Sequence, residues 1–227
     1  MGIRYSGPVL LAAAVLLALT SCSAGQSAHT SGSETGGGAP VVFRAATDDP
    51  VVFLTIDDGA VRDAAMTTVL KKAEVPASLF LTSDYAVDEP EFFRRLRDET
   101  GSRIEGHSID HSDLKGRDFA DQKRQICRPA RSYTKAFGKR PRLFRPPYGS
   151  YDETTLRAAD ECGVSRVVLW SAEIKDGTMS FAAADRLRPG DIVLMHFGDN
   201  FREDVREFVT QADRSGLRPA LLEEHLE

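Results

Sequence analysis

Runs of basic residues are absent from this chain of 227 residues. Its 29 Lys and Arg residues and 34 Asp and Glu residues are mixed along the sequence and give a net charge of −5. A nucleic-acid-binding surface usually gathers Lys and Arg on one face or along one helix. The composition therefore gives no indication of a nucleic-acid partner, and the mild acidity favours solubility without saying more. Neither an internal repeat nor a sign of an obligate protein partner is evident.

The N-terminal apolar run is too short for a comfortable membrane span. It covers Val9 to Leu19, follows Arg4 and precedes Thr20-Ser21-Cys22, whereas a span needs about 20 apolar residues. This layout predicts a secretory signal peptide over residues 1–21. Residues 19–22 also resemble a bacterial lipobox, in which Cys22 carries the lipid; a plain signal peptide with an incidental Cys is the alternative. We expect an exported protein, lipid-anchored to the outer face of the cytoplasmic membrane or secreted.

Apolar side chains are nearly absent from residues 23–40, which read SAGQSAHTSGSETGGGAP. Such a segment cannot bury enough surface to order itself. We predict a flexible tether over residues 22–49 and one folded domain over residues 50–227.

Cysteine is scarce, with three residues in the chain. If Cys22 carries lipid, Cys127 and Cys162 remain. Because an exported protein leaves the reducing cytosol, this pair favours a disulfide over two buried thiols.

From Pro50 onward, apolar runs alternate with amphipathic stretches. This alternation predicts parallel strands covered by helices, in an α/β barrel or a doubly wound sheet. About seven strands in a domain this short are few for a full barrel of about 250 residues. We therefore predict a distorted, incomplete (β/α) barrel with about seven parallel strands. The expected strands are 51–56, 77–81, 103–106, 143–145, 164–170 and 191–195, and the expected helices are 62–72, 91–99, 119–137 with a break near Pro129, 152–161 and 201–214, before a closing element at 219–226.

Polar side chains follow most of the predicted strands, at the point where each strand ends. In α/β folds, chemistry gathers at the carboxyl ends of parallel strands. Three of the five His residues fall at such ends. The residues at these positions are Asp57, Asp58, His107, His111, Arg145, Glu173, Asp176 and His196.

His107 and His111 are spaced i, i+4, which lets two imidazoles face one point. Together with one carboxylate they suit a divalent transition metal. Zn²⁺ is the expected metal, with Co, Ni or Mn as alternatives. Asp57 and Asp58 are adjacent, so an extended backbone points them in different directions; one is free to bind the metal while the other acts as a base. A solvated turn is the alternative for this Asp-Asp-Gly stretch.

Four short motifs, TIDDG (55–59), HSIDH (107–111), RPPYG (145–149) and LMH (194–196), occur in this order. As a set they resemble the polysaccharide deacetylases, or NodB-homology domain, of carbohydrate esterase family four. The resemblance covers residues 50 to about 215. It implies a metal-dependent N- or O-deacetylase on a distorted (β/α) barrel.

The resemblance also implies a role for each matching residue. Asp57 matches the general base, and Arg145 matches the Arg that pairs with it. Asp58, His107 and His111 match the metal ligands. Tyr148 matches the position whose backbone N–H helps to hold the oxyanion. Leu194 matches an apolar wall for the acetyl methyl group, and His196 matches the general acid.

One stretch departs from the family pattern. An Asp-Trp pair is common there, with the Asp supporting the acid His and the Trp lining the acetyl pocket. In WSAEIKDG (170–177), Asp176 matches the Asp, but Gly177 stands in place of the Trp. The supporting carboxylate is therefore Asp176 or Glu173. We expect Phe197 to replace the missing wall and Trp170 to pack within its strand.

The leading hypothesis is a lipid-anchored deacetylase that acts on acetylated polysaccharide, with the N-acetyl groups of GlcNAc units in peptidoglycan or chitin-type oligomers as expected targets. O-acetylated xylan is an alternative substrate. A metal-holding carbohydrate-binding lipoprotein that has lost activity is a second class, and a purely structural surface lipoprotein is a third.

Overall fold

The structure, a computed structural model, describes residues 1–2 and 37–226. The predicted signal peptide, Cys22 and the first part of the predicted tether lie outside the described residues. Within the described ranges, no helix has the length and apolarity that crossing a membrane requires.

A curved sheet forms the centre of the folded unit. The described residues contain ten strands: β1 (Val41–Val42), β2 (Val51–Asp58), β3 (Ala77–Leu81), β4 (Arg103–Gly106), β5 (Leu143–Phe144), β6 (Arg166–Val168), β7 (Ala172–Lys175), β8 (Thr178–Phe181), β9 (Ile192–His196) and β10 (Arg218–Pro219). Their order is β1-β6-β5-β4-β3-β2-β9-β7-β8, with β10 beside β2. Every strand pair is parallel except β7 with β8, which is antiparallel.

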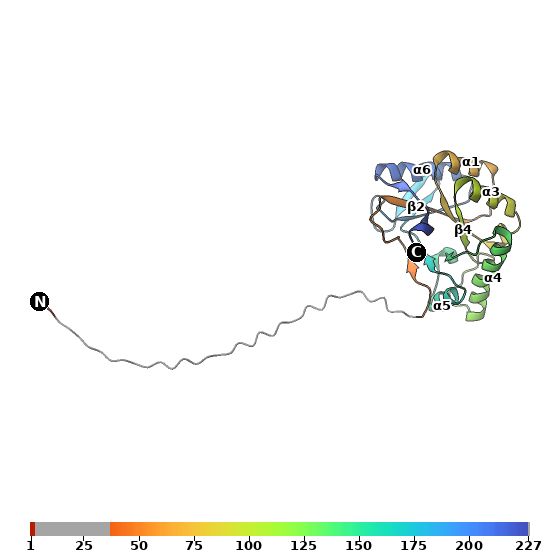
Figure 1. The fold of residues 1–227 in the computed structure, drawn as a ribbon, viewed down its shortest axis with the longest axis horizontal. Helices are drawn as coiled ribbons and strands as arrows, with labels where there is room; N and C mark the ends of the chain where they lie inside the picture. Colours follow the sequence, from red (N-terminus) through yellow and green to blue (C-terminus); the bar gives the residue numbers. More distant parts are fainter. Residues whose placement is uncertain (3–36, 227) are drawn as a thin grey trace, which may run out of the picture. The chain divides into compact units, whose positions relative to one another are not determined.

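Helices lie outside the sheet, as Figure 1 shows. They are α1 (Ala64–Ala73), α2 (Ser83–Ala86), α3 (Pro90–Thr100), α4 (Phe119–Phe137), α5 (Glu153–Glu161) and α6 (Phe201–Arg214), with short 3₁₀ turns η1 (Pro147–Gly149) and η2 (Leu222–Glu224). Because β1 and β8 end the strand order without pairing to each other, the barrel is open. The prediction of an incomplete (β/α) barrel is confirmed, while the estimate of seven strands was too low.

The additional strands are short or lie in an unforeseen hairpin. β1 pairs with β6, and Ala39 and Ala45 are buried, so residues 39–49 belong to the folded unit instead of the predicted tether. β7 and β8 form a hairpin whose turn residues, Asp176 and Gly177, have φ values of 52° and 72°. Such positive φ values are typical of two-residue hairpin turns.

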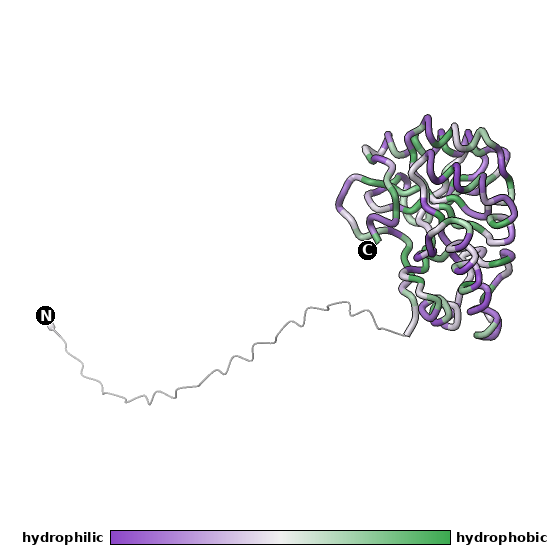
Figure 2. The backbone as a smooth tube through the Cα atoms, turned by 45° about the vertical axis from the view of Figure 1, so that its right-hand side comes forward, coloured by the Kyte–Doolittle hydropathy of each residue, from purple (hydrophilic) through white to green (hydrophobic). Residues whose placement is uncertain are grey.

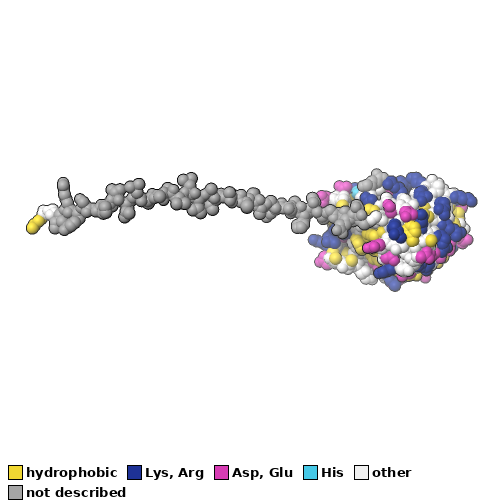
Figure 3. Space-filling view, turned by 90° about the horizontal axis from the view of Figure 1, so that it is seen from below, with side chains coloured by type: hydrophobic (Ala, Val, Ile, Leu, Met, Phe, Trp, Pro, Cys, Tyr) yellow, Lys and Arg dark blue, Asp and Glu magenta, His cyan; other side chains and the backbone are white. Residues whose placement is uncertain are grey.

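Alternation along the strands divides the core into two layers. On β2, Leu54 and Ile56 belong to the outer layer, which includes residues of α1, α3 and α6. Val51 and Phe53 belong to a layer inside the barrel. Figure 2 shows the hydrophobic strands within the folded unit, and Figure 3 shows acidic and basic side chains interspersed on one face. Thr55 and Asp57, the polar residues of β2 on the same face as Phe53, therefore point into the barrel.

A disulfide fastens α4 to α5. Cys127 of α4 bonds to Cys162, the C-cap residue of α5. The disulfide favoured by the sequence is therefore present. The helix break expected near Pro129 is absent, and α4 runs through it. We attribute this to the buried face on both sides, including Ile126, Ala130 and Tyr133, whose packing outweighs one missing backbone hydrogen bond.

Two acidic side chains meet below the barrel, at the amino ends of the strands. Glu105 accepts hydrogen bonds from the backbone N–H groups of Arg142 and Leu143 at 2.8 and 2.7 Å. Glu223 of η2 accepts one from Ser78 Oγ at 2.8 Å. Burial, followed by repulsion from Glu223, raises the pKa of Glu105 well above its usual value. Burial raises the pKa of Glu223 to about 7.

We predict that this pair makes stability depend on pH. A carboxyl group whose pKa is raised on folding stabilises the fold below its unfolded pKa, and that contribution is lost as pH rises through the folded value. The free energy of unfolding should therefore fall by roughly 3 kcal/mol between pH 5 and pH 8. Urea unfolding of wild type and Glu223→Gln measures this, with exposed Glu224→Gln as the control. An unchanged pH dependence in Glu223→Gln would contradict the assignment.

Candidate active site

The predicted site residues converge at the carboxyl ends of β2, β4, β5 and β9. These strands lie within one parallel stretch of the sheet, with β2 between β9 and β3. Parallel neighbours end at the same edge, so residues far apart in sequence meet there. In the register of β2 and β9, Asp57 lies beside His196.

Asp57 and Arg145 form an ion pair inside the barrel. Arg145 is fully buried, and Asp57 is 3% exposed. Arg145 Nη1 donates to Asp57 Oδ1 at 2.6 Å and to Thr55 Oγ1 at 2.9 Å. Its Nε and Nη2 donate to the carbonyl oxygens of Val168 and Leu169. Burial lowers the pKa of the Arg145 guanidinium, and attraction to Asp57 acts against that effect. The network fixes Asp57 Oδ1, while Oδ2 lies 3.8 Å from His107 Nε2. Asp57 also lines the cavity described below.

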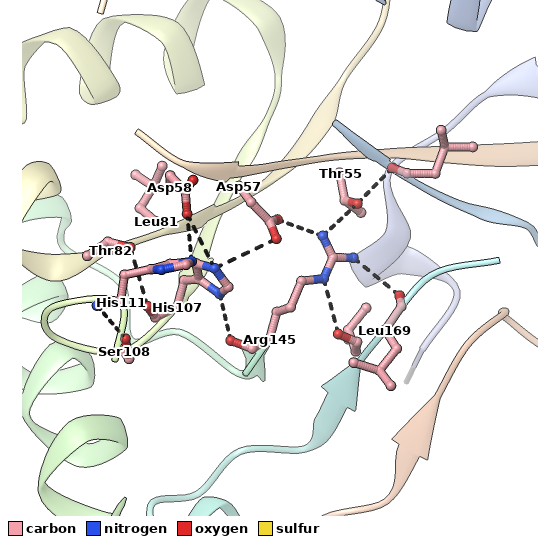
Figure 4. A network of polar contacts seen from close by, with 12 residues as sticks. Thr55, Asp57, Asp58, Leu81, Thr82, His107, Ser108, His111, Arg145 and Leu169 are labelled. Atoms are coloured by element: carbon pink, nitrogen blue, oxygen red, sulfur yellow. Dashed lines mark hydrogen bonds and ion pairs between the residues drawn. The ribbon is translucent and has the colours of Figure 1, made fainter. Parts of the chain in front are cut away.

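Asp58 faces two imidazoles (Figure 4). Its Oδ1 lies 3.4 Å from His107 Nε2 and 3.2 Å from His111 Nε2. His107 Nδ1 lies 2.7 Å from the carbonyl oxygen of Arg145. If Nδ1 carries the proton and donates to that oxygen, Nε2 is free as a ligand; such a second bond is usual for a metal-binding His.

The three residues fit a divalent transition metal. Each offers one ligand atom, and these atoms all lie within 4.8 Å of one another. Two imidazoles and one carboxylate are a donor set that such ions accept, leaving an open position for water or substrate. Asp58 Oδ1 is buried, and within the described residues it has no hydrogen-bond partner. A buried acceptor of this kind needs a partner, and a cation shared with the two histidines supplies one.

The protonation of these groups suits metal binding. Burial opposes ionisation of Asp58, but the neighbouring imidazoles, that of His107 most strongly, outweigh it and lower the pKa of Asp58. Burial, followed by repulsion from His107, lowers the pKa of His111. Both shifts favour the forms that bind cations, an ionised carboxylate and a neutral imidazole.

Left-handed backbone conformations are concentrated in the site. Outside glycine, six described residues have positive φ, and four of them, Asp58, Ser108, His111 and Tyr148, lie in its loops. This conformation costs an ordinary residue about 1–2 kcal/mol. At Tyr148, whose φ is 60°, the ring contacts His111 with centroids 4.7 Å apart. The backbone is thus bent at the positions where the side chains must turn toward one point.

A cavity of about 450 Å³ opens beside the three ligand residues. Its walls are Asp57, Asp58, His107, His111, Tyr148, Gly149, Trp170, Glu173, Leu194 and His196. Leu194 supplies an apolar wall, as expected. Trp170 packs against the inner core, in agreement with the expected packing role. It also lines the cavity and lies 5.5 Å from the Arg145 guanidinium. It follows β6, where the chain leaves the sheet.

Phe197 does not form the wall predicted for it. Successive strand residues point to opposite faces, and His196 lines the cavity while Phe197 turns outward. Phe197 is 4% exposed and contacts the rings of Phe93 and Phe201.

Asp176 does not line the cavity either. It lies in the β7–β8 turn, is exposed, and accepts a hydrogen bond from Asn200 Nδ2 at 2.7 Å. Glu173 is half-buried on β7 and lines the cavity, but it makes no side-chain hydrogen bond to a described residue. The hairpin explains these placements. Glu173 lies on its first strand, beside the cavity, whereas the turn carries Asp176 beyond the end of that strand.

Sequence reasoning missed Thr55, which bonds to Arg145 from inside the barrel. The sequence contained a sign of this contact, because residues 55 and 57 are two apart on one strand and so point to the same face of β2. It also missed Asp204, a buried carboxylate on α6 that accepts a hydrogen bond from Gly177 N–H at 2.7 Å. Nothing in the helical pattern of residues 201–214 marks this Asp.

Comparison with known proteins identifies relatives along most of the chain. The sequence model of the family described as polysaccharide deacetylase matches residues 44–167. An uncharacterized protein of Streptomyces coelicolor is 40% identical over 82% of this chain and 77% of its own. A chitooligosaccharide deacetylase of Sinorhizobium fredii is 31% identical over 69% of this chain and 76% of its own.

A solved structure has the same fold. It is a carbohydrate esterase family 4 pseudoenzyme from Bacillus anthracis, with a TM-score of 0.72 and 22% identity over 84% of this chain and 69% of its own. At this identity the likeness concerns the fold alone.

We predict that Arg145→Met destabilises the protein by about 3–5 kcal/mol, because it leaves Asp57 buried without its partner. Adding Asp57→Asn to that variant should recover part of the loss, since the unpaired charge is then gone. Urea unfolding of the two single variants and the double variant measures the coupling. Arg95→Met, which removes the exposed pair with Glu99, is the control and should change stability by less than about 1 kcal/mol. Equal losses in Arg145→Met and its double variant would contradict the argument.

We also predict that the protein binds one equivalent of Zn²⁺ or a similar divalent ion. Equilibrium dialysis should show that His107→Ala and His111→Ala lose this ion, because each removes one of three ligands. His196→Ala is the matched control and should retain it, since His196 is outside the ligand group. If His107→Ala retained the ion, or if His196→Ala lost it, the ligand assignment would be contradicted.

Proposed function

The chain belongs to the polysaccharide deacetylase family, and from that premise we propose that it is a metal-dependent hydrolase that removes N-acetyl groups from GlcNAc units of a polysaccharide. One observation carries the proposal. Asp58, His107 and His111 converge on one point, while Asp57 and His196 line the same cavity beside it. The name of the Sinorhizobium fredii relative, a chitooligosaccharide deacetylase, supports an N-acetylated amino-sugar chain as substrate.

Asp58, His107 and His111 would hold the ion. A divalent metal supplies polarisation of the acetyl carbonyl and makes water acidic enough to attack near neutral pH. The remaining steps belong to the side chains and backbone around it.

Asp57 is the proposed base. Its Oδ1 is held by Arg145, so Oδ2 accepts the proton of the attacking water. The hydrogen bond from the buried guanidinium fixes the direction in which Oδ2 points. Positioned acid–base groups of this kind contribute about 10²–10⁴-fold to a rate.

Tyr148 and Leu194 are proposed to hold the acetyl group. The Tyr148 N–H makes no hydrogen bond within the described residues, and Tyr148 lines the cavity. It is therefore free to donate to the acetyl oxygen as negative charge develops there. Leu194 gives the methyl group an apolar contact. His196, at the end of β9, then protonates the departing amine.

We further propose export and lipid attachment at Cys22, on the strength of the N-terminal sequence. Two or three acyl chains would keep the catalytic unit at the membrane surface, near cell-wall glycan. Peptidoglycan is therefore the proposed substrate, with chitin-type oligomers as the soluble form of the same chemistry.

We predict that the purified protein releases acetate from N-acetylglucosamine oligomers. Asp57→Asn should lower the rate by about 10²–10⁴-fold because it removes the base, and a chelator should abolish activity. Asp48→Asn, an exposed change of the same kind, is the control. O-acetylated xylan is assayed in parallel. Full activity in Asp57→Asn contradicts the catalytic assignment, and release from xylan alone contradicts the N-acetyl specificity.

A further inference from the structure

Asp204 is a buried carboxylate that the proposed mechanism leaves unused. It lies in the first half of α6 and is 7% exposed. Burial raises its pKa above the usual value, and attraction to His196 acts in the opposite direction. A buried acid near a catalytic edge is a candidate for a role in the chemistry.

The fold brings Asp204 and the acid His196 to one cavity. Helix α6 begins five residues after His196, so its first turns stand over the end of β9. Asp204 and His196 line one cavity of about 450 Å³. That cavity shares Asp58, Glu173 and His196 with the cavity at the ligand group. His196 therefore lines both the cavity that holds Asp204 and the cavity beside the ligand group.

The hairpin turn fixes Asp204 in this position. Gly177 N–H donates to Asp204 Oδ1 at 2.7 Å, and no described residue donates a hydrogen bond to Oδ2. The φ of Gly177 is 72°, a conformation that glycine adopts without strain. A Trp at position 177, as in the family pattern, would be strained. Gly177, which replaces the Trp of the family pattern, is thus also the residue that anchors Asp204.

The other carboxylates near His196 are less suited to support it. Asp176 and Asp199 line the same cavity as Asp204, but both are exposed, and Asp176 is bonded to Asn200. Glu173 is half-buried on β7, where no hydrogen bond to a described residue fixes its carboxylate. Charge acts more strongly from a buried, fixed position than from an exposed one.

We propose that Asp204 is a positioning residue that stabilises the protonated imidazole of His196 while it acts as the acid. The proposal rests on the proposed function. In that step the amide C–N bond breaks, its electron pair stays on the nitrogen, and the proton of the His196 imidazolium completes the amine. His196 ends neutral, and Asp204 remains ionised throughout.

The test compares two leaving groups. An amine needs a proton to depart, whereas the phenolate of 4-nitrophenyl acetate departs without one. Asp204→Asn should lower kcat/KM for N-acetylglucosamine oligomers by 10–100-fold, in the range of one acid–base interaction, and change aryl acetate hydrolysis by less than about twofold. Asp199→Asn, which alters another carboxylate of the same cavity, should change neither.

A double-mutant cycle separates this role from a structural one. In a His196→Ala background, Asp204→Asn should have little further effect on amide hydrolysis, because the residue acts through His196. Asp204→Glu, which keeps the charge, should restore part of the amide activity. Equal losses on both substrates, or an undiminished loss in the His196→Ala background, would overturn the proposal. Wild-type protein without amide hydrolysis would instead refute the proposed function.

Discussion

The buried pair of Arg145 and Asp57 is the interaction on which the site depends. A fully buried guanidinium is costly unless its donors are satisfied, and here they bond to β2 and to carbonyl groups at the end of β6. Phe80 lies 4.4 Å from the guanidinium inside the barrel. The Arg145 carbonyl oxygen also contacts His107. Arg145, which directly follows β5, therefore fixes the proposed base through its side chain and a proposed metal ligand through its backbone.

The open barrel makes this arrangement possible because its strands end at one edge. β2 lies at the centre, with β9 on one side and β3 and β4 on the other. Residues of β2 that point inward meet Arg145, and Asp58, where the backbone turns to a φ of 75°, meets the two histidines. The same alternation sends His196 to the cavity and Phe197 to the outer core.

Much of this could be predicted from the sequence because its signals are local. The buried strands and α6 follow from apolar periodicity, and α6 has the predicted bounds. The polar strand ends located the site residues. By contrast, β1 and β10 have two residues each, too few for any periodic pattern. The wall formed by Trp170 depends on where the chain leaves β6, which is a property of tertiary packing.

The hairpin of β7 and β8 shows where sequence comparison and geometry separate. In the family pattern, Asp176 matches the carboxylate that supports the acid, but its position in the turn exposes it and ties it to Asn200. The turn's next residue instead holds a carboxylate that comes from α6. The ligands, base and Arg are confined to strand ends, whose geometry the sheet dictates. Groups around the acid come from a hairpin turn and a helix, which lie outside the strands, so their chemistry can be supplied from another element while the rest of the site is unchanged.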